Sequence, residues 1–290
     1  MNKTAVVTDT NSGITPDECR ELGIYAMPMP VIADAETFYE GQDMDHQKLY
    51  RFMAEDKDLS TSQPSPGDVT ALWDRLLQEG YENVLYIPMS SGLSGSCAAS
   101  RGYAAEYDGK VQVADVRRIS VTLRDSVLDA RYFAEQGLSA AETCEKIESN
   151  AAASVVYLGV DTLKYFKKNG RATAAAVAIA TVLNLKPILI TEGGKFDSFA
   201  KVRGIKACKD RIIQALRNEL NTRFKDVPAS ELHLATASTL PTAKEEEEWR
   251  STVQAAFPEF EVGYDPLSCS IACHTGIGAV GAGLSRIQRV

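Results

Sequence analysis

The chain has 290 residues, of which 44% are hydrophobic and 24% are charged, a balance typical of a globular protein. This composition excludes a disordered chain, a collagen and a coiled coil. With 31 basic and 39 acidic residues the formal net charge is −8, so the chain has no general attraction for nucleic acid or anionic lipid.

The first half of the chain alternates short β-rich runs with helical segments. Thr15 and Glu18 have the spacing of a capping box, and Pro16 takes the first helical position, so a helix is expected to begin there. Strands are expected at residues 5–8, 84–89 and 111–115, and further helices from near residues 45, 65, 97, 120 and 139. Strands separated by helices favour a parallel sheet with ligands at the carboxyl ends of its strands. We therefore predict a three-layer, Rossmann-like α/β domain over residues 1–150.

Two segments of this half are expected to lie outside the regular sheet. Residues 26–32 contain Pro28 and Pro30, which cannot donate to a ladder, so this segment is predicted to be an edge strand or extended. Residues 60–64 are predicted to form a loop before a helix that starts at Ser65 and Pro66.

The second half has a different pattern. A strand is expected at residues 154–160, followed by a helix at 161–168 that ends at Asn169 and Gly170. Further expected elements are an apolar helix at 172–183, a β-hairpin of 187–192 and 195–202, a long amphipathic helix at 204–223, strands at 231–237 and 259–264, and a helix between them around 245–249. We predict a two-layer α/β domain with a mixed sheet over residues 151–290, with the boundary near Asn150.

The location of the protein is predicted from its apolar runs and cysteines. Asp9 ends the first apolar run well short of a signal peptide's core, and the apolar stretch at 172–183 is too short to span a membrane. The six cysteines form no C-x-x-C pair and are expected to be reduced thiols. Cys269, Cys273 and His274 lack a second pair at zinc spacing, so no metal site is expected. We expect a cytoplasmic protein with no membrane insertion, no metal and no cofactor.

A serine-rich loop follows the strand at 84–89. Gly92 to Ser96 approaches the nucleophile elbow G-x-S-x-G, but Ser96 takes the place of the last glycine. A serine hydrolase or acyltransferase using Ser91 or Ser94 with His274 is therefore an alternative. Free N–H groups and serine hydroxyls at a helix start also suit a carboxylate or phosphate. Capping of the helix by Ser94 or Ser96 explains the same pattern.

Other patterns are less specific. Gly276-x-Gly278-x-x-Gly281 matches the dinucleotide fingerprint, but the chain ends before the acidic residue that the motif requires. Thr61 and Ser62 are hydroxyls in a predicted loop without an evident structural role. Arg171 belongs to a basic cluster at a helix end, where positive charge is ordinarily favourable.

Several motifs in order carry a resemblance over essentially the whole chain. They are residues 7–12 (VTDTNS), 61–66 (TSQPSP), 90–96 (SSGLSGS), 163–171 (LKYFKKNGR), 183–189 (LNLKPIL) and 274–276 (HTG). Together these motifs make the sequence similar to the DegV family of bacterial fatty-acid-binding proteins.

The resemblance implies a two-domain, DegV-like α/β fold that binds a long-chain fatty acid in a buried pocket. The matching residues imply that the carboxylate contacts Thr61, Ser62, Ser91, Gly92 and Ser94, and that Arg171, His274 and Thr275 lie near the head group. Characterised members present the acid to a soluble fatty acid kinase, which forms an acyl phosphate for phospholipid synthesis. The resemblance thus implies a carrier that is not itself an enzyme.

The chain also departs from the family pattern. Asp115-Val116 stands where many members have Asp-Ser, Thr122 and Arg124 stand where a Gly-x-Gly is common, and Ile277 replaces a proline. These departures bear on the pocket wall near residues 116–124 and so on the preferred chain length.

Overall fold

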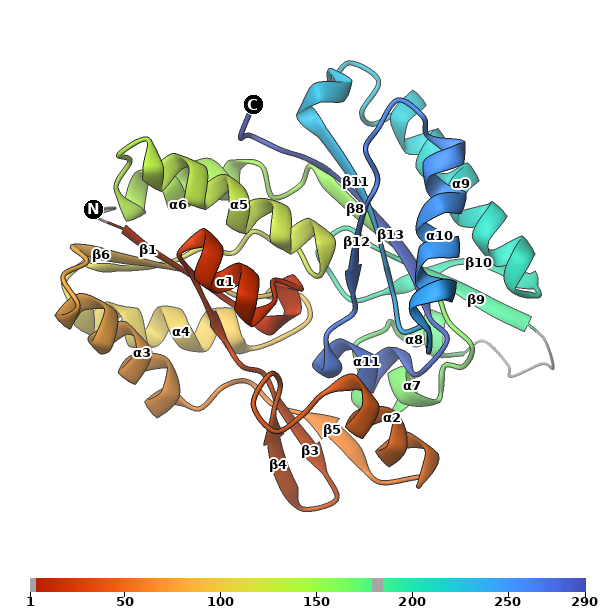
Figure 1. The fold of residues 1–290 in the computed structure, drawn as a ribbon, viewed down its shortest axis with the longest axis horizontal. Coiled ribbons are helices and arrows are strands. Elements are labelled where there is room, and N and C mark those ends of the chain that lie inside the picture. Colours follow the sequence, from red (N-terminus) through yellow and green to blue (C-terminus); the bar gives the residue numbers. More distant parts are fainter. Residues whose placement is uncertain (1–3, 179–184) are drawn as a thin grey trace.

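Three β-sheets organise the protein, whose computed structural model describes residues 4–178 and 185–290 (Figure 1). The first sheet is parallel, with strand order β2-β1-β6-β7. Its strands are β1 (Thr4–Asp9), β2 (Ile24–Met27), β6 (Asn83–Ile87) and β7 (Val111–Val113). The predicted parallel sheet is confirmed.

Helices cover both faces of this sheet, which gives the predicted three layers. The helices are α1 (Pro16–Leu22), α3 (Pro66–Gln78), α4 (Ser96–Ala104), α5 (Val121–Glu135) and α6 (Ala140–Ser149). Ala5 and Val7 of β1 belong to the core with α3 and α4, whereas Val6 belongs to the core with α1, α5 and α6. This alternation follows from the two-residue period of a strand, which sends successive side chains to opposite faces.

Helix starts in this half follow local capping chemistry. The side chains of Thr15, Ser65 and Ser139 each accept a hydrogen bond from the backbone N–H three residues on. Glu18 and Glu142 return the bond to the capping residue's own backbone, which completes two capping boxes. Each cap is worth about 1 kcal/mol, which explains why these starts are predictable from short motifs.

The second sheet is mixed and has strand order β10-β9-β8-β13-β11-β12. Its strands are β8 (Ser154–Gly159), β9 (Leu185–Thr191), β10 (Asp197–Arg203), β11 (Leu232–Ser238), β12 (Gly263–Pro266) and β13 (Val280–Arg286). Only β11 and β12 pair in parallel among these described strands. The predicted mixed sheet and the β9–β10 hairpin are confirmed.

The two faces of the mixed sheet pack against different partners. α9 (Ile205–Asn221) and α10 (Ala243–Ala256) cover one face. The other face joins a core with Leu93, Ile119 and Val121 from the first half of the chain. α7 (Lys164–Asn169), α8 (Ala174–Val177) and α11 (Cys269–Thr275) complete this layer. The core between the two sheets is therefore built from both halves of the chain.

A third, antiparallel sheet was not expected from the sequence. It consists of β4 (Glu36–Tyr39), β3 (Pro30–Ala33) and β5 (Leu59–Thr61), and it packs with α2 (His46–Ala54) and α11. The predicted single segment at 26–32 is divided between β2 and β3, which belong to different sheets. Part of the predicted loop at 60–64 is strand β5, because it pairs with β3 from a distant part of the chain.

Two other boundaries differ from expectation. The predicted strand at 259–264 lies later, as β12. Of the apolar helix expected at 172–183, α8 covers Ala174–Val177, capped by Thr173, and residues 179–183 lie outside the described residues. In the described ranges no helix has both the length and the apolar character required to cross a bilayer.

Candidate functional site

A narrow cavity lies where the segments after β1, β5 and β6 meet α11. Its polar lining residues are Asn11, Thr61, Ser62, Gln63, Ser94, Arg171, Ser270, His274 and Thr275. Its main apolar lining residues are Met89, Leu93, Ile119, Phe166, Phe196 and Ile271. Segments far apart in the sequence thus bring hydroxyls, two amides, one imidazole and one guanidinium to a single cavity.

A second, smaller cavity with an apolar lining adjoins the first on the side of the mixed sheet. Ile119, Phe196 and Ile271 line both parts. Beyond them lie Val121, Val156, Leu158, Ala237, Leu267 and the strand residues 281–283. The cavity volume is about 50 Å³ in the polar part and about 20 Å³ in the apolar part. We call the first cavity the polar mouth and the second the apolar end.

Thr61 and His274 form a hydrogen-bonded pair in the polar mouth. Thr61 ends β5 and His274 belongs to α11, and the packing of α11 on the small sheet brings Thr61 Oγ1 within 2.9 Å of His274 Nε2. Burial and the nearby Arg171 guanidinium lower the pKa of His274 to about 3. His274 is therefore neutral near pH 7, and its Nδ1 has no hydrogen-bond partner among the described residues.

Arg171 reaches the cavity from the turn after α7. Its Nε donates to the Leu93 carbonyl at 3.3 Å, and its Nη1 donates to the Asn169 carbonyl. The interpretation of Arg171 as positive charge at a helix end is met in part, because Asn169 is the last residue of α7. Its Nη2 has no partner within the described ranges, so one N–H face of the guanidinium remains for another acceptor.

Ser62, Ser94 and Thr275 also lie at the cavity. The Ser94 hydroxyl oxygen accepts the Ser96 N–H at 3.1 Å, so Ser94 assists the start of α4 while it lines the cavity. Ser62 Oγ donates to the Gln63 carbonyl at 3.1 Å. The hydroxyls of Ser62 and Ser94 thus make local hydrogen bonds and also line the cavity.

Ser91 and Gly92, which were expected to contact the carboxylate, are not among the residues that line the cavity. The Ser91 hydroxyl donates to the Asp115 carboxylate at 2.5 Å, and that carboxylate repels any anion beside it. Gly92 packs so closely on the β9–β10 turn that an added Cβ would lie 2.3 Å from the Gly193 carbonyl oxygen. The loop is held in place by this packing.

Several N–H groups of the serine-rich loop bond within the protein. The N–H groups of Leu93 and Ser94 donate to the Ser90 carbonyl, and the Gly92 N–H donates to Ser90 Oγ. The Ser91 N–H donates to Asp115. These four donors are therefore used within the protein.

Sequence reasoning missed Asn11, Gln63 and Ser270. The segment after β1 was expected to lie at the ligand edge of the sheet, but nothing in the sequence singled out Asn11 within it. Ser270 lies 259 residues from Asn11, and their contact depends on the docking of α11. No local motif predicts such a contact.

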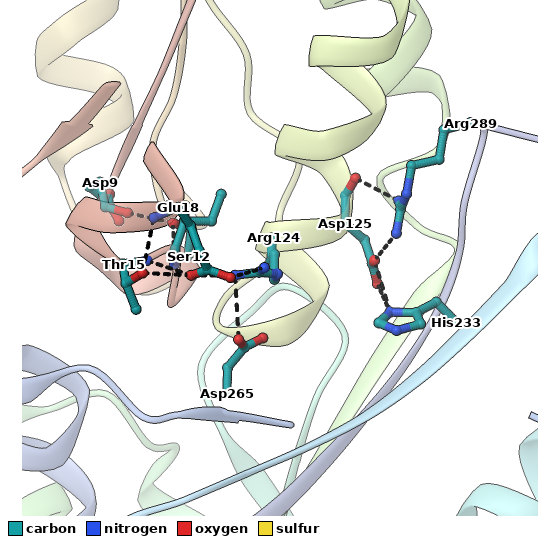
Figure 2. Close-up of polar contacts among 10 residues, drawn as sticks. Asp9, Ser12, Thr15, Glu18, Arg124, Asp125, His233, Asp265 and Arg289 are labelled. Atoms are coloured by element: carbon teal, nitrogen blue, oxygen red, sulfur yellow. Dashed lines mark hydrogen bonds and ion pairs between the residues drawn. The ribbon is translucent and has the colours of Figure 1, made fainter. Parts of the chain in front are cut away.

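The residues that depart from the family pattern do not line the cavity. Arg124 forms ion pairs with Glu18 at 2.5 Å and with Asp265 at 3.4 Å, and Figure 2 places this cluster where α1 and α5 approach β12. The Thr122 hydroxyl donates to the Ile119 carbonyl. Val116 is buried in the core of the first half, and Ile277 packs beside the small sheet.

A larger groove of about 720 Å³ lies beside α1, β2 and the segment before α2. Thr10, Glu40 and His46 border it, but it contains none of the site residues predicted from the sequence. Among residues 4–178 and 185–290, no group of three or more His, Cys, Asp or Glu side chains is arranged to hold a metal ion.

Comparisons with known proteins agree with this fold. The chain is 28% identical to a DegV domain-containing protein of Deinococcus radiodurans, covering 98% of this chain and 99% of that one. It is 30% identical to one of Listeria monocytogenes, covering 96% and 97% of the two chains. A DegV family protein from Thermus thermophilus, described as fatty acid binding, has a TM-score of 0.86 and 26% identity over 98% of this chain and 100% of that one.

A fourth protein shares the fold at lower identity. The stearic-acid-binding protein of Eubacterium ventriosum has a TM-score of 0.83 at 21% identity, over 99% of this chain and 98% of that one. The profile of the DegV family, described as uncharacterised proteins, matches residues 3–286. This protein belongs to the DegV family.

Proposed function

We propose that the protein binds one long-chain fatty acid, with its carboxylate in the polar mouth and its alkyl chain in the apolar end. The observation that carries this proposal is the cavity itself, in which hydroxyl, amide and guanidinium donors adjoin a wall of apolar side chains. The fatty acid binding described for the relative from Thermus thermophilus supports the same ligand class.

The alkyl chain supplies most of the binding free energy in this proposal. Burial contributes about 0.8 kcal/mol per CH₂, so about fourteen methylenes contribute roughly 11 kcal/mol before the costs of association. A few donors then need only orient the carboxylate. This division suits a cavity with one guanidinium and otherwise neutral donors.

The neutral His274 suits a hydrogen-bond relay to the carboxylate. When Nε2 carries the ring proton, it donates to Thr61 Oγ1 and leaves the Thr61 hydroxyl hydrogen free for the ligand. When Nδ1 carries it, Thr61 must donate to Nε2 and has no hydrogen for the ligand. A bound carboxylate therefore selects the Nε2–H tautomer.

The small cavity volume has a consequence for binding. An acyl chain of this length needs more room than the apolar end offers, so wall side chains must change rotamer when it enters. Phe196 adjoins both parts of the cavity and packs against the Phe166 ring at 5.5 Å. We expect Phe196 to move when the chain passes from the mouth to the end.

Bound ligand is the direct test. We expect protein purified from a bacterial host to carry about one fatty acid per chain, because the buried chain dissociates slowly from a cavity between the two sheets. Native mass spectrometry, followed by mass spectrometry of the extracted lipid, measures both stoichiometry and identity. A sugar or nucleotide in place of the acid, or a protein that takes up no added long-chain acid, contradicts the proposal.

We further propose that the bound acid is presented to a soluble fatty acid kinase, which transfers a phosphoryl group to a carboxylate oxygen and forms an acyl phosphate. Arg171 supports this step, since a guanidinium with a free N–H face stabilises charge on transferring oxygens. The hydrolase alternative has less support. The low pKa of His274 makes it a weak base, its Nδ1 has no described carboxylate partner, and Ser91 is bound to Asp115.

Arg171→Ala is expected to lower acyl phosphate formation at least about tenfold while the protein keeps its bound acid, because the lost charge acts mainly on the transferring group. The product is trapped with hydroxylamine and counted as hydroxamate in a reaction with kinase and nucleotide. Lys167→Ala is the matched control, because Lys167 is an exposed cation on α7 outside the cavity lining.

Melting curves of both variants separate chemistry from folding, because Arg171 also binds two backbone carbonyls. Arg171→Lys restores the charge and should recover part of the turnover. Full turnover in folded, acid-loaded Arg171→Ala refutes a role in presentation.

A further inference from the structure

The larger groove beside α1 runs along an edge of the parallel sheet. Because the strand order is β2-β1-β6-β7, β2 is an edge strand. Ile24 and Ala26 pack with the core on the side of α1 and α5, whereas Tyr25 packs with the core on the opposite face. All three residues nevertheless line the groove. Since successive side chains of a strand point to opposite faces, the feature they share in the groove is the backbone edge of β2.

This backbone edge has hydrogen-bonding groups without a described partner. β2 pairs with β1 over Ile24–Met27. Apart from that ladder, no described hydrogen bond involves a backbone group of these four residues. Alternate residues of a parallel strand direct their N–H and C=O groups to the same side, so about half of these groups point away from β1. Such an edge is open to pairing with a further strand.

The charge of the described groove lining is mainly negative. It contains the carboxylates of Glu40 and Asp45 and a single guanidinium, that of Arg20. Arg20 is already bound to the exposed carboxylate of Asp17. Asp45 is exposed at the rim, where its side chain caps α2. The groove therefore offers two carboxylates to a cationic ligand.

Glu40 gains most from such a cation. Its carboxylate accepts hydrogen bonds from the Thr10 hydroxyl at 2.8 Å and from the N–H and thiol of Cys269. These donors are neutral, and a carboxylate has about four acceptor positions, so a further donor fits beside them. Burial raises the pKa of Glu40, and the nearby His46 imidazole only partly offsets this. An ammonium or guanidinium in the groove supplies the charge that stabilises the ionised form.

We propose that the groove binds an extended segment of a partner protein, which adds a strand to the outer edge of β2 and pairs a lysine or arginine with Glu40. In this mode of recognition main-chain hydrogen bonds supply affinity and side-chain contacts supply specificity. The groove volume of about 720 Å³ lies within the range of ligand clefts, about 300–1,000 Å³. The groove and the polar mouth share no described lining residue, so this inference is independent of the proposed function.

Panning of a phage-displayed library of linear twelve-residue peptides on the unmodified protein is the first test. Gln42→Trp serves for counterselection, because Gln42 is an exposed lining residue and an indole there fills part of the groove. We expect the selected peptides to carry a lysine or arginine within a run of β-branched or aromatic residues. If no selected peptide binds the unmodified protein at least about tenfold more tightly than Gln42→Trp, the docking site is refuted.

Gln47→Trp is the matched control for this substitution. Gln47 is also exposed, but it lies on α2 outside the groove lining. The fluorescence anisotropy of a labelled selected peptide gives the affinities, and melting curves show that both variants fold. Gln47→Trp should keep the affinity within about twofold. A loss in Gln47→Trp equal to that in Gln42→Trp places the peptide elsewhere and overturns the inference.

Modified forms of the selected peptide test strand addition and the ion pair separately. N-methylation of one alternate set of residues should weaken binding at least about tenfold, and N-methylation of the other set should weaken it less, because only one set faces β2. Norleucine in place of the cationic residue should weaken binding to the unmodified protein about tenfold and have little effect on binding to Glu40→Gln. Equal losses from the two N-methylated sets refute strand addition, whether or not Glu40→Gln folds. An equal norleucine effect in both proteins refutes the pairing with Glu40.

Other occupants of the groove give different results. A second copy of the chain predicts a dimer in sedimentation equilibrium that Gln42→Trp dissociates. A small amine predicts that n-butylamine binds as tightly as the peptide. Either result assigns the groove to that occupant and overturns the proposal.

Discussion

Ala237→Phe is expected to weaken binding of a long-chain acid by about two orders of magnitude and to leave shorter acids nearly unaffected. Ala237 is 3% exposed and lines the apolar end of the cavity from β11. A phenyl ring there fills the space of about four methylenes, each worth about 0.8 kcal/mol, so the long acid loses roughly 3 kcal/mol. Affinities for a series of saturated acids of increasing length measure the effect.

Ala215→Phe provides the matched control for this substitution. Ala215 lies on α9, is also 3% exposed, and packs against the opposite face of the mixed sheet. Overpacking costs both variants about 1–3 kcal/mol of unfolding free energy. Only Ala237→Phe should change the dependence of affinity on chain length. Equal selectivity profiles for the two variants would place the alkyl chain elsewhere.

A buried ionic cluster joins α5 to the mixed sheet and to the end of the chain (Figure 2). Asp125 Oδ2 lies 3.0 Å from His233 Nδ1, and Asp125 Oδ1 accepts from Arg289 Nη2 at 2.7 Å. The Ser285 hydroxyl donates to Oδ2 at 2.5 Å. Because Asp125 is 1% exposed, these partners replace the water that would otherwise surround its charge.

Asp125→Ala is expected to lower the free energy of unfolding by about 3–5 kcal/mol, because it removes the buried counter-charge of His233 and one of the two that pair with Arg289, the other being Asp129. Chemical denaturation at pH 6 gives the value. Glu247→Ala provides the comparison, since it breaks an exposed ion pair with Arg250 and should have a far smaller effect. A small loss of unfolding free energy in Asp125→Ala would mean that water or rearranged side chains compensate for the missing carboxylate.

The same cluster predicts that the free energy of unfolding depends on pH. Burial raises the pKa of Asp125, but the hydrogen bond and charge of His233 and the charge of Arg289 outweigh it and lower the pKa to about 2. This stabilisation is complete above the unfolded pKa, about 3.9, and is lost as the pH falls toward 2.

His233 responds in the opposite direction. Burial lowers its pKa, but the hydrogen bond and charge of Asp125 outweigh burial and raise it. The contribution of His233 to the free energy of unfolding is complete below its pKa in the unfolded chain, about 6.5. This contribution is lost as the pH rises through its pKa in the folded protein. We therefore expect the stability difference between the unmodified protein and Asp125→Asn to be largest between about pH 4 and 6.5. A difference that does not change from pH 4 to pH 9 would contradict the charged pair.

The sequence alone determined the features that short segments encode. Caps such as Thr15 and Ser139 bind backbone N–H groups three residues away, so their helix starts do not depend on the rest of the fold. The alternation of strands and helices in the first half predicted a parallel sheet covered on both faces. The resemblance to the family predicted that Thr61, Arg171 and His274 share a site, and the three residues line one cavity.

Tertiary structure decided which polar groups meet at the cavity. Thr61 and His274 are 213 residues apart, and their contact exists because α11 docks on a small sheet formed by β3 and β5. Asn11 lines the cavity for the same reason, since Ser268, which caps α11, and Ser270 within it bind its amide oxygen. Ser91 leaves it because Asp115, 24 residues on, captures its hydroxyl. Hydroxyl-rich loops look alike in sequence, and only the packing of distant elements determines whether a hydroxyl faces a ligand or a neighbouring carboxylate.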